Sequence, residues 1–177
     1  SYELTEKGYF LHEITIDTLE KTIIINSGRH FDDIILNGTQ SVELSIFKKK
    51  KPILRLSPKE LADYLERQTM KFANMGFPFV QISLDSIRIS EAQIEANLKV
   101  SKGKYYTFKK LNIKGDSSIS QRTIHGIIDY QLNEAYAELK VRDVDRKIEQ
   151  CSFIAGIKPA EIMYTSEGFE IFIYVKS

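Results

Sequence analysis

The chain has 177 residues, and its 25 Lys and Arg residues nearly balance its 24 Asp and Glu residues, which leaves a formal net charge of +1. This balance excludes a protein that binds nucleic acid through general attraction to phosphates, because such binding needs an excess of positive charge. A content of 42% hydrophobic and 28% charged residues is typical of a globular protein. No apolar run approaches the roughly 20 residues of a membrane-spanning helix. The length fits one medium domain or two small ones.

The first predicted elements are the two strands of a β-hairpin, over residues 9–16 and 22–26. Both segments are rich in apolar residues, and a polar stretch separates them. A third strand, over residues 31–36, follows Gly28 and has the spacing of a buried strand. We therefore interpret residues 1–27 as the C-terminal part of a preceding unit.

Residues 41–56 form the least regular segment of the sequence. Alternating apolar residues at its start are typical of a strand, whereas Lys48–Lys51 and Pro52 indicate a loop. We expect the first helix of this unit to be short or replaced. The run Lys48–Lys51 fits a solvated loop, and it also fits a contact with anionic lipid.

A well-defined helix is predicted after residue 56. Ser57–Glu60 forms a capping box with Pro at the first helical position, and apolar residues recur at helical spacing as far as Asn74–Gly76. Alternation over Phe79–Ile89 and again over Ile94–Val100 predicts the two strands of a hairpin.

The C-terminal part of the chain has the same order of elements. A strand over residues 108–113 is followed by a helix, which we expect Ser118–Gln121 to cap. A second helix is predicted over residues 141–151, with its end at Gly156. A hairpin with a turn at Ser166–Gly168 follows.

Glycines divide the chain into repeats of about 75 residues. Gly28 and Gly103 each begin a stretch in which an aromatic residue, two apolar residues and a second glycine follow in the same order. Gly8, Gly76 and Gly156 form a second set, each ahead of a hairpin. Each complete unit then has the order strand, helix, helix, strand, strand. We predict an α+β fold of tandem small domains, with two helices packed on a three-stranded mixed sheet.

The repeat resembles polypeptide-transport-associated (POTRA) domains, in particular the tandem POTRA domains of outer-membrane protein assembly factors of the BamA/TamA type. The resemblance rests on the unit order, on Gly76–Phe79, and on the stretches Gly103–Phe108 and Leu111–Asp116. It predicts POTRA-like domains over residues 28–102 and 103–177. Because the chain ends where another boundary glycine would fall, we expect it to be a segment of a longer array.

The resemblance implies a periplasmic location, as part of an outer-membrane protein of a Gram-negative bacterium, and a role in protein transport and membrane biogenesis. The implied partners are unfolded outer-membrane proteins, accessory lipoproteins of an assembly complex, adjacent POTRA repeats and a C-terminal membrane barrel outside this chain. Nucleic acid is not among them. The alternative is a POTRA module of a two-partner secretion transporter or of a cell-division scaffold protein.

The hairpin in each unit has a physical basis for binding partners without sequence specificity. The second strand of the unit is expected at a sheet edge, where free N–H and C=O groups can pair with an extended segment of a partner. The same strands also fit ordinary edge strands packed on a neighbouring repeat. The predicted protein-binding residues are Phe79, Val80, Gln81, Ile82, Ser83, Leu84 and Asp85 in one unit and Ile162, Met163, Tyr164 and Thr165 in the other.

The sequence contains no pattern typical of an enzyme or a metal site. His12, His30 and His125 lie in three different units without metal-ligand spacing, and Cys151 is the single cysteine. Neither a P-loop nor a nucleophile elbow occurs. We therefore expect no enzymatic activity, no metal and no cofactor.

Overall fold

A computed structural model describes residues 7–8, 13–17, 22–37, 53–91, 93–116 and 118–176. Contacts between Cα atoms divide the chain into two units, Ser1–Gln68 with Ile82–Ser101 and Thr69–Gln81 with Lys102–Ser177. Each unit has its own cluster of buried apolar residues. The irregular segment 41–52, with Lys48–Lys51, lies outside the described residues, as does His12.

The described part of the first unit consists of strands and one helix. Its elements are β1 (Glu13–Asp17), β2 (Thr22–Asn26), β3 (Asp33–Asn37), β4 (Leu54–Leu56), α2 (Pro58–Ala73), β5 (Gln81–Ile89) and β6 (Gln93–Ser101). β1 and β2 form the predicted antiparallel hairpin. The other four strands form a sheet in the order β4-β3-β6-β5, in which β3 runs antiparallel to β4 and parallel to β6.

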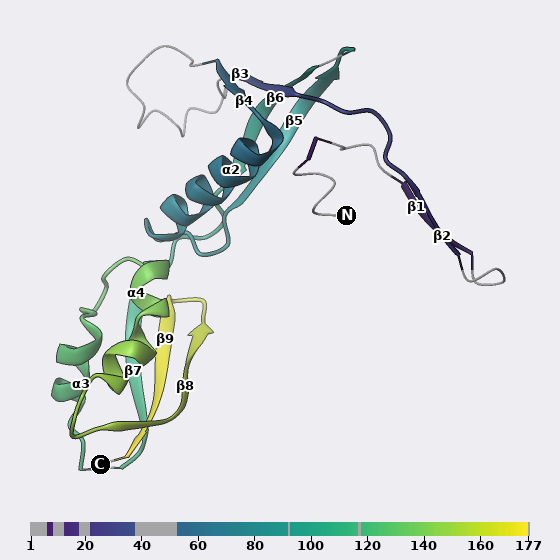
Figure 1. Ribbon diagram of the computed structural model, residues 1–177. Coiled ribbons are helices and arrows are strands. Elements are labelled where there is room, and N and C mark those ends of the chain that lie inside the picture. Colours follow the sequence, from purple (N-terminus) through teal and green to yellow (C-terminus); the bar gives the residue numbers. More distant parts are fainter. Residues whose placement is uncertain are drawn as a thin grey trace. The chain divides into compact units, whose positions relative to one another are not determined.

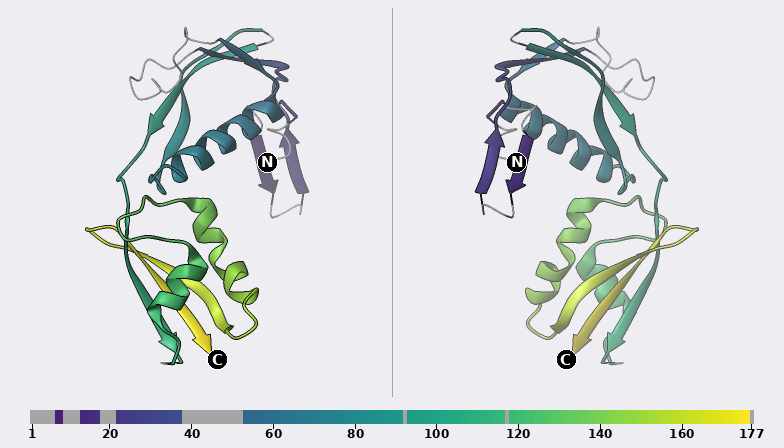
Figure 2. Two further views of the ribbon diagram at one scale, coloured as in Figure 1. Left: turned by 90° about the vertical axis from the view of Figure 1, so that its left-hand side faces the viewer. Right: turned by 90° about the vertical axis from the view of Figure 1, so that its right-hand side faces the viewer.

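The core of the first unit lies between α2 and this sheet, and Figure 2 shows the helix along one face of the strands. Ile34 and Leu36 of β3 are paired with Ile94 and Ala96 of β6, and all four side chains are buried. Leu61 of α2 joins the same cluster. The apolar side chains whose alternation predicted these strands therefore face the core.

The predicted capping box of α2 is confirmed. Ser57 N donates to Glu60 Oε2 at 2.8 Å, and Glu60 N donates to Ser57 Oγ at 3.4 Å. These hydrogen bonds with Ser57 lower the pKa of the Glu60 carboxyl. Pro58 takes the first helical position, where the missing N–H group costs no hydrogen bond.

The sheet of the first unit has four strands, and the prediction of three was wrong here. The additional strand is β4, which pairs with β3 through Leu54–Leu36 and Leu56–Ile34. It is three residues long, so it contains a single period of alternation. A pattern this short does not distinguish a strand from a loop.

The second unit agrees with the predicted order of elements and is α+β. Its elements are β7 (Phe108–Gly115), α3 (Gln121–Ile128), α4 (Glu138–Arg142), α5 (Val144–Glu149), β8 (Ala155–Tyr164) and β9 (Phe169–Lys176). The sheet has the order β7-β9-β8, with β7 parallel and β8 antiparallel to β9. Figure 1 shows the helices on one side of these three strands.

Aromatic side chains form the centre of the second core. Phe108 of β7 and Phe169 of β9 are fully buried, and their ring centroids lie 5.6 Å apart. Ile124 of α3 and Val144 of α5 are fully buried in the same cluster. The two helices thus cover the sheet face on which both Phe rings lie.

One of the two helix predictions in this unit is confirmed and the other was wrong. The predicted capping segment Ser118–Gln121 contains the N-cap of α3, which is Ser120: its hydroxyl accepts a hydrogen bond from Thr123 N. The second predicted helix is divided at Asp143 into α4 and α5, because Asp143 N is shared among three carbonyl oxygens and the regular helical pattern is interrupted. Gly156 does not end this helix but lies within β8, where pairing with β9 draws it into the sheet.

Two landmarks of the repeat have the same local structure. Gly8 has φ +92° and its carbonyl accepts a hydrogen bond from Phe31 N at 3.0 Å, and Gly76 has φ +101° and accepts one from Tyr106 N at 2.8 Å. A side chain at either glycine would be strained by the left-handed φ and would also collide with neighbouring atoms. Gly156 has no positive φ, so it is not a third copy of this landmark. The predicted domain boundaries after residues 27 and 102 stay predictions.

Candidate functional site

β5 and β8 each lie at one edge of their sheet. Of the predicted binding residues, Thr165 is the first residue beyond β8. Partner binding at the predicted residues stays a prediction. β5 carries the predicted residues Gln81, Ile82, Ser83, Leu84 and Asp85, and β8 carries Ile162, Met163 and Tyr164.

Phe79 and Val80 do not lie on an edge strand, and this part of the prediction was wrong. They belong to a turn in which Val80 N donates to Phe77 O at 3.3 Å, and β5 begins only at Gln81. The left-handed φ of Gly76 and the fixed φ of proline at position 78 favour a turn here. Val80 is buried, whereas Phe79 is half-exposed.

The edges opposite β5 and β8 are formed by β4 and β7. In the first unit β4 pairs with the outer side of β3. In the second unit the loop before α4 covers the start of β7: Phe108 N donates to Glu134 O, and Asn133 N to Phe108 O, both at 2.8 Å. The exposed Lys110 and Lys114 follow further along β7, and lysines on an edge strand discourage pairing with another chain. In the second unit β8 is therefore the edge better suited to a partner, and in the first unit β5 is the edge formed by the hairpin.

The first half of β5 is the part suited to pairing. Its side chains alternate as predicted, with Ile82 and Leu84 half-buried and Ser83 and Asp85 exposed. Ser86 then has φ 52°, a left-handed conformation that is uncommon for a residue other than glycine. Because a pairing strand needs extended backbone, a regular ladder along this edge ends there.

The open backbone groups of β8 follow from its pairing with β9. Thr165 N donates to Gly168 O at 2.8 Å, and bonded and non-bonded residue pairs alternate along an antiparallel ladder. Met163 therefore exchanges hydrogen bonds with β9. The N–H and C=O groups of Ile162 and Tyr164 point to the open side.

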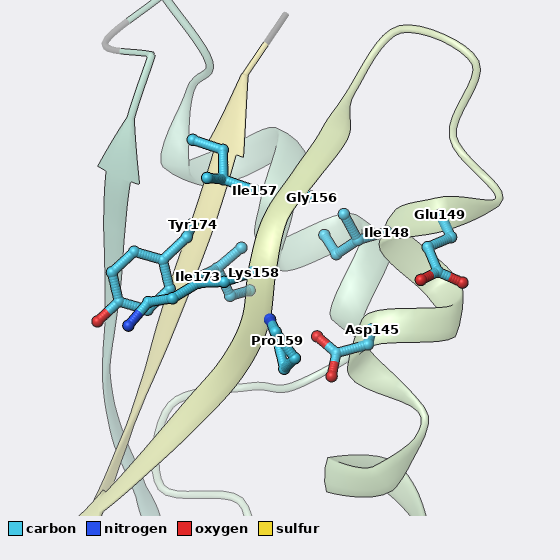
Figure 3. A pocket seen from close by; sticks show the side chains of 9 residues that line it. All are labelled: Asp145, Ile148, Glu149, Gly156, Ile157, Lys158, Pro159, Ile173 and Tyr174. Carbon is cyan, nitrogen blue, oxygen red and sulfur yellow. The ribbon is translucent and has the colours of Figure 1, made fainter.

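A pocket of about 300 Å³ lies beside the other half of β8, between that strand and α5 (Figure 3). Asp145 Oδ1 accepts a hydrogen bond from Ala160 N at 2.8 Å, so a side chain of α5 contacts the strand edge at this point. The pocket is lined by Asp145, Ile148, Glu149, Gly156, Ile157, Lys158, Pro159, Ile173 and Tyr174.

Three side chains, those of Lys158, Glu161 and Tyr174, form a hydrogen-bonded network on the outer face of this half of β8. Lys158 Nζ donates to Glu161 Oε1 at 2.5 Å, and the Tyr174 hydroxyl donates to Glu161 Oε2 at 2.7 Å. The hydrogen bonds from Lys158 and Tyr174 lower the pKa of Glu161, and the bond to Glu161 raises the pKa of Lys158. The network spans a register shift of the strand between Lys158 and Glu161.

Phe79 belongs to an aromatic cluster that sequence analysis missed. Its ring centroid lies 4.6 Å from that of Tyr164 and 5.7 Å from that of Tyr106, and Tyr136 lies 5.9 Å from Tyr164. Burial raises the pKa of both Tyr164 and Tyr136. Phe79 nevertheless stays 51% exposed, so the cluster presents an apolar surface next to the end of β8. The sequence did not indicate this cluster, because Phe79 continues the apolar alternation of the following strand and was therefore assigned to that strand.

The described residues contain no group of three or more His, Cys, Asp and Glu side chains placed to hold a metal ion. His125 Nδ1 lies 3.3 Å from Tyr130 O, and His30 lies 3.3 Å from the Asp32 carboxylate, so both histidines have local partners. No helix in the described ranges is both long and apolar enough to cross a membrane. The chemistry that the open edges offer is backbone pairing.

Solved structures with the same arrangement of helices and strands decide the fold. POTRA domains 3–5 of BamA from Haemophilus influenzae match with a TM-score of 0.58 and 15% sequence identity, over 99% of this chain and 76% of that one. BamA from Haemophilus ducreyi lacking POTRA domains 1–3 matches with a TM-score of 0.56 and 15% identity, over 84% of this chain and 29% of that one. The chain has the POTRA fold.

The POTRA resemblance inferred from the repeat is thereby confirmed at the level of fold. No protein-family model matches the sequence, and no curated protein matches it either. In this POTRA fold, β8 is the hairpin strand at the open edge and β9 is the central strand.

Proposed function

We propose that this chain is a periplasmic POTRA segment of an outer-membrane β-barrel assembly protein in a Gram-negative bacterium. It acts as a binding module and not as an enzyme. Unfolded outer-membrane proteins and accessory lipoproteins bind to it by adding an extended segment to β5 or β8. Adjacent POTRA repeats and a membrane barrel complete the parent protein.

The observation that carries the proposal is the position of a hairpin strand at a sheet edge in both units, together with the asymmetry of the second sheet. In the second unit the edge at β7 is partly covered and carries lysines, whereas the hairpin strand β8 lies at the other edge; in the first unit the hairpin strand β5 likewise lies at a sheet edge. Natural proteins generally protect sheet edges, so an edge left open in two units is a candidate for strand addition. Main-chain hydrogen bonds carry no sequence information, which suits a module that receives many different clients.

The expected affinity of one edge is low. Ile162 and Tyr164 each present one N–H and one C=O group, so a client segment forms four backbone hydrogen bonds with them. At a net value of about 1 kcal/mol for each bond, these contribute about 4 kcal/mol, which corresponds to roughly millimolar binding. Transient binding of this strength allows a client to move on to the next site.

The proposal includes the predicted domains: residues 1–27 end one POTRA-like domain, and residues 28–102 and 103–177 form two more. The equivalent backbone contacts of Gly8 and Gly76 support it, since each precedes a hairpin. In β2, Ile23–Ile25 are all more than half exposed. Such a strand fits a sheet that further residues complete.

Site-specific photo-crosslinking tests the binding. A photoreactive side chain is placed at Ser83 on β5 or Met163 on β8, and a small outer-membrane barrel protein diluted from urea serves as client. We expect crosslinks at both positions, and loss of the Met163 crosslink when Ile162 is replaced by proline, because the Ile162 N–H group points to the open side and proline cannot donate a backbone hydrogen bond. The circular dichroism spectrum should stay unchanged.

The matched control is a photoreactive side chain at Lys114 on β7, at the opposite side of the second sheet. Crosslinking at Lys114 as strong as at Met163 would contradict strand addition. Unchanged crosslinking at Met163 in the folded Ile162→Pro variant would do the same.

A further inference from the structure

The open edge of β8 ends at a side chain from α5. Asp145 Oδ1 accepts the hydrogen bond of Ala160 N at 2.8 Å, and Figure 3 shows this carboxylate reaching toward Pro159. Ala160 N thus bonds to α5, which Figure 3 shows on the side of β8 away from β9, so this N–H group is already used. Proline at position 159 has no N–H group to offer. A partner paired with Ile162 therefore finds no free N–H donor at Ala160 or at the proline that precedes it.

The segment of β8 from Gly156 to Glu161 is also out of register with β9. β8 shifts against β9 between Gly156 and Lys158 and again between Lys158 and Glu161. The hydrogen bonds of Lys158 and Tyr174 with Glu161 hold this irregular segment on the outer face. A regular ladder does not run through such a segment, because the spacing of its backbone groups is interrupted.

We propose that Asp145 determines the length and register of the segment that β8 accepts. Its carboxylate occupies the Ala160 N–H group, ends the docking edge there and confines pairing to Ile162 and Tyr164. This inference rests on the proposed function. The ligand is a short extended peptide segment whose chain leaves the sheet at Ala160, and not a strand that runs the whole length of β8.

The chemistry of a carboxylate explains why it stops a strand. An ionised carboxylate only accepts hydrogen bonds, so it satisfies Ala160 N without offering a donor to the partner. A partner that continues past Ile162 must displace Asp145 or bury its charge against the peptide backbone. Both are costly because the displaced carboxylate loses its hydrogen bond in a partly desolvated place.

Amide hydrogen exchange measured by NMR on the isotope-labelled full chain tests the inference. The probe is an acetylated and amidated peptide, Lys-Thr-Val-Thr-Tyr-Thr-Val-Lys, whose alternation is typical of a barrel strand. In the unsubstituted protein we expect Ala160 N–H to be protected without peptide and unaffected by it. The amides of Ile162 and Tyr164 should gain protection when the peptide is added.

Two truncations of Asp145 provide the comparison. In Asp145→Ala, Ala160 N–H should exchange fast in the free protein, gain protection with peptide, and raise the peptide affinity about fivefold through one added hydrogen bond. Asp145→Ser, whose hydroxyl is too short to reach Ala160, should behave in the same way and keeps a polar residue in the first turn of α5. Asp145→Asn retains an acceptor oxygen and should match the unsubstituted protein.

The outcomes separate this inference from the proposed function. If the peptide protects neither Ile162 nor Tyr164 in the unsubstituted protein, strand addition to β8 is wrong. If it protects both, but Ala160 gains no protection and affinity does not rise in the folded Asp145→Ala or Asp145→Ser protein, the role of Asp145 is overturned and strand addition stands.

Discussion

At the scale of single residues, Glu138 shows how local donors control a charge. The Tyr136 hydroxyl donates to one of its carboxylate oxygens at 2.5 Å, and Arg142 Nε donates to the other at 2.6 Å. Burial by itself would raise the pKa of Glu138, but the hydrogen bonds from Tyr136 and Arg142 outweigh it, and the pKa lies below its ordinary value of 4.5. The ionised carboxylate therefore stabilises the folded chain.

This arrangement predicts a pH-dependent effect of Glu138→Gln. Because the folded pKa is lowered, the stabilisation is fully present above the unfolded value of 4.5 and is lost as the pH falls through the folded pKa. The melting temperature of Glu138→Gln should be lower than that of the unsubstituted protein at neutral pH, and the difference should shrink as the medium is acidified below 4.5. A difference that stays constant over this range would contradict the role assigned to the charge.

At the scale of secondary-structure elements, α3 depends on its two ends. It has eight residues, and isolated helices of this length are not stable in water. The Ser120 hydroxyl accepts the Thr123 N–H hydrogen bond at 3.1 Å at the start, and Asp129 adopts a left-handed conformation with φ 56° at the end. Ile124 and Ile128 are buried between these caps and hold the helix on the core.

The position of the N-cap predicts that alanine substitutions at Ser120 and Ser118 differ in their effect on the free energy of unfolding. Ser120→Ala should reduce the free energy of unfolding by about 1 kcal/mol, because one N–H group at the helix start loses its acceptor. Ser118→Ala is the matched control, since its backbone N–H keeps the bond to Asp116 Oδ1 and its side chain does not cap the helix. Urea denaturation followed by circular dichroism measures both. Equal destabilisation by the two substitutions would show that Ser120 is not the cap.

At the scale of the whole molecule, the two cores differ in size. Among the described residues, the cluster of the second unit contains thirteen buried side chains and that of the first contains six. Burial of apolar side chains is the main source of folding free energy, so the larger cluster should belong to the more stable unit. The unit with the smaller cluster contains β5 from Ile82 onward, so this edge strand belongs to the unit that is expected to be less stable.

Native-state hydrogen exchange in increasing urea tests this order. The amides of Ile94 and Ala96 in β6 should lose protection at lower urea concentrations than those of Ile171 and Ile173 in β9. Ile171→Ala, which is expected to cost about 3 kcal/mol, should lower the protection of β9. One common transition for both strands in the unsubstituted protein would contradict the prediction.

Local patterns in the sequence predicted most of the secondary structure. The capping box at Ser57–Glu60, the alternation of β5 and β6 and the helix around Ile124 are all confirmed. The short strand β4 and the break at Asp143 were missed, because three residues carry too little pattern and a helix interruption depends on hydrogen bonds that residue types do not reveal.

The sequence by itself determined the repeat, the α+β order of elements and the strands that can face a core, because these follow from the spacing of apolar residues and glycines along the chain. Only the tertiary structure decided which edges are open and where they end. Phe79 packs on Tyr164, and Asp145 binds Ala160, across distances in sequence that no local pattern spans. Such contacts depend on how the strands and helices are brought together in space, and they are the contacts that shape the candidate binding edge.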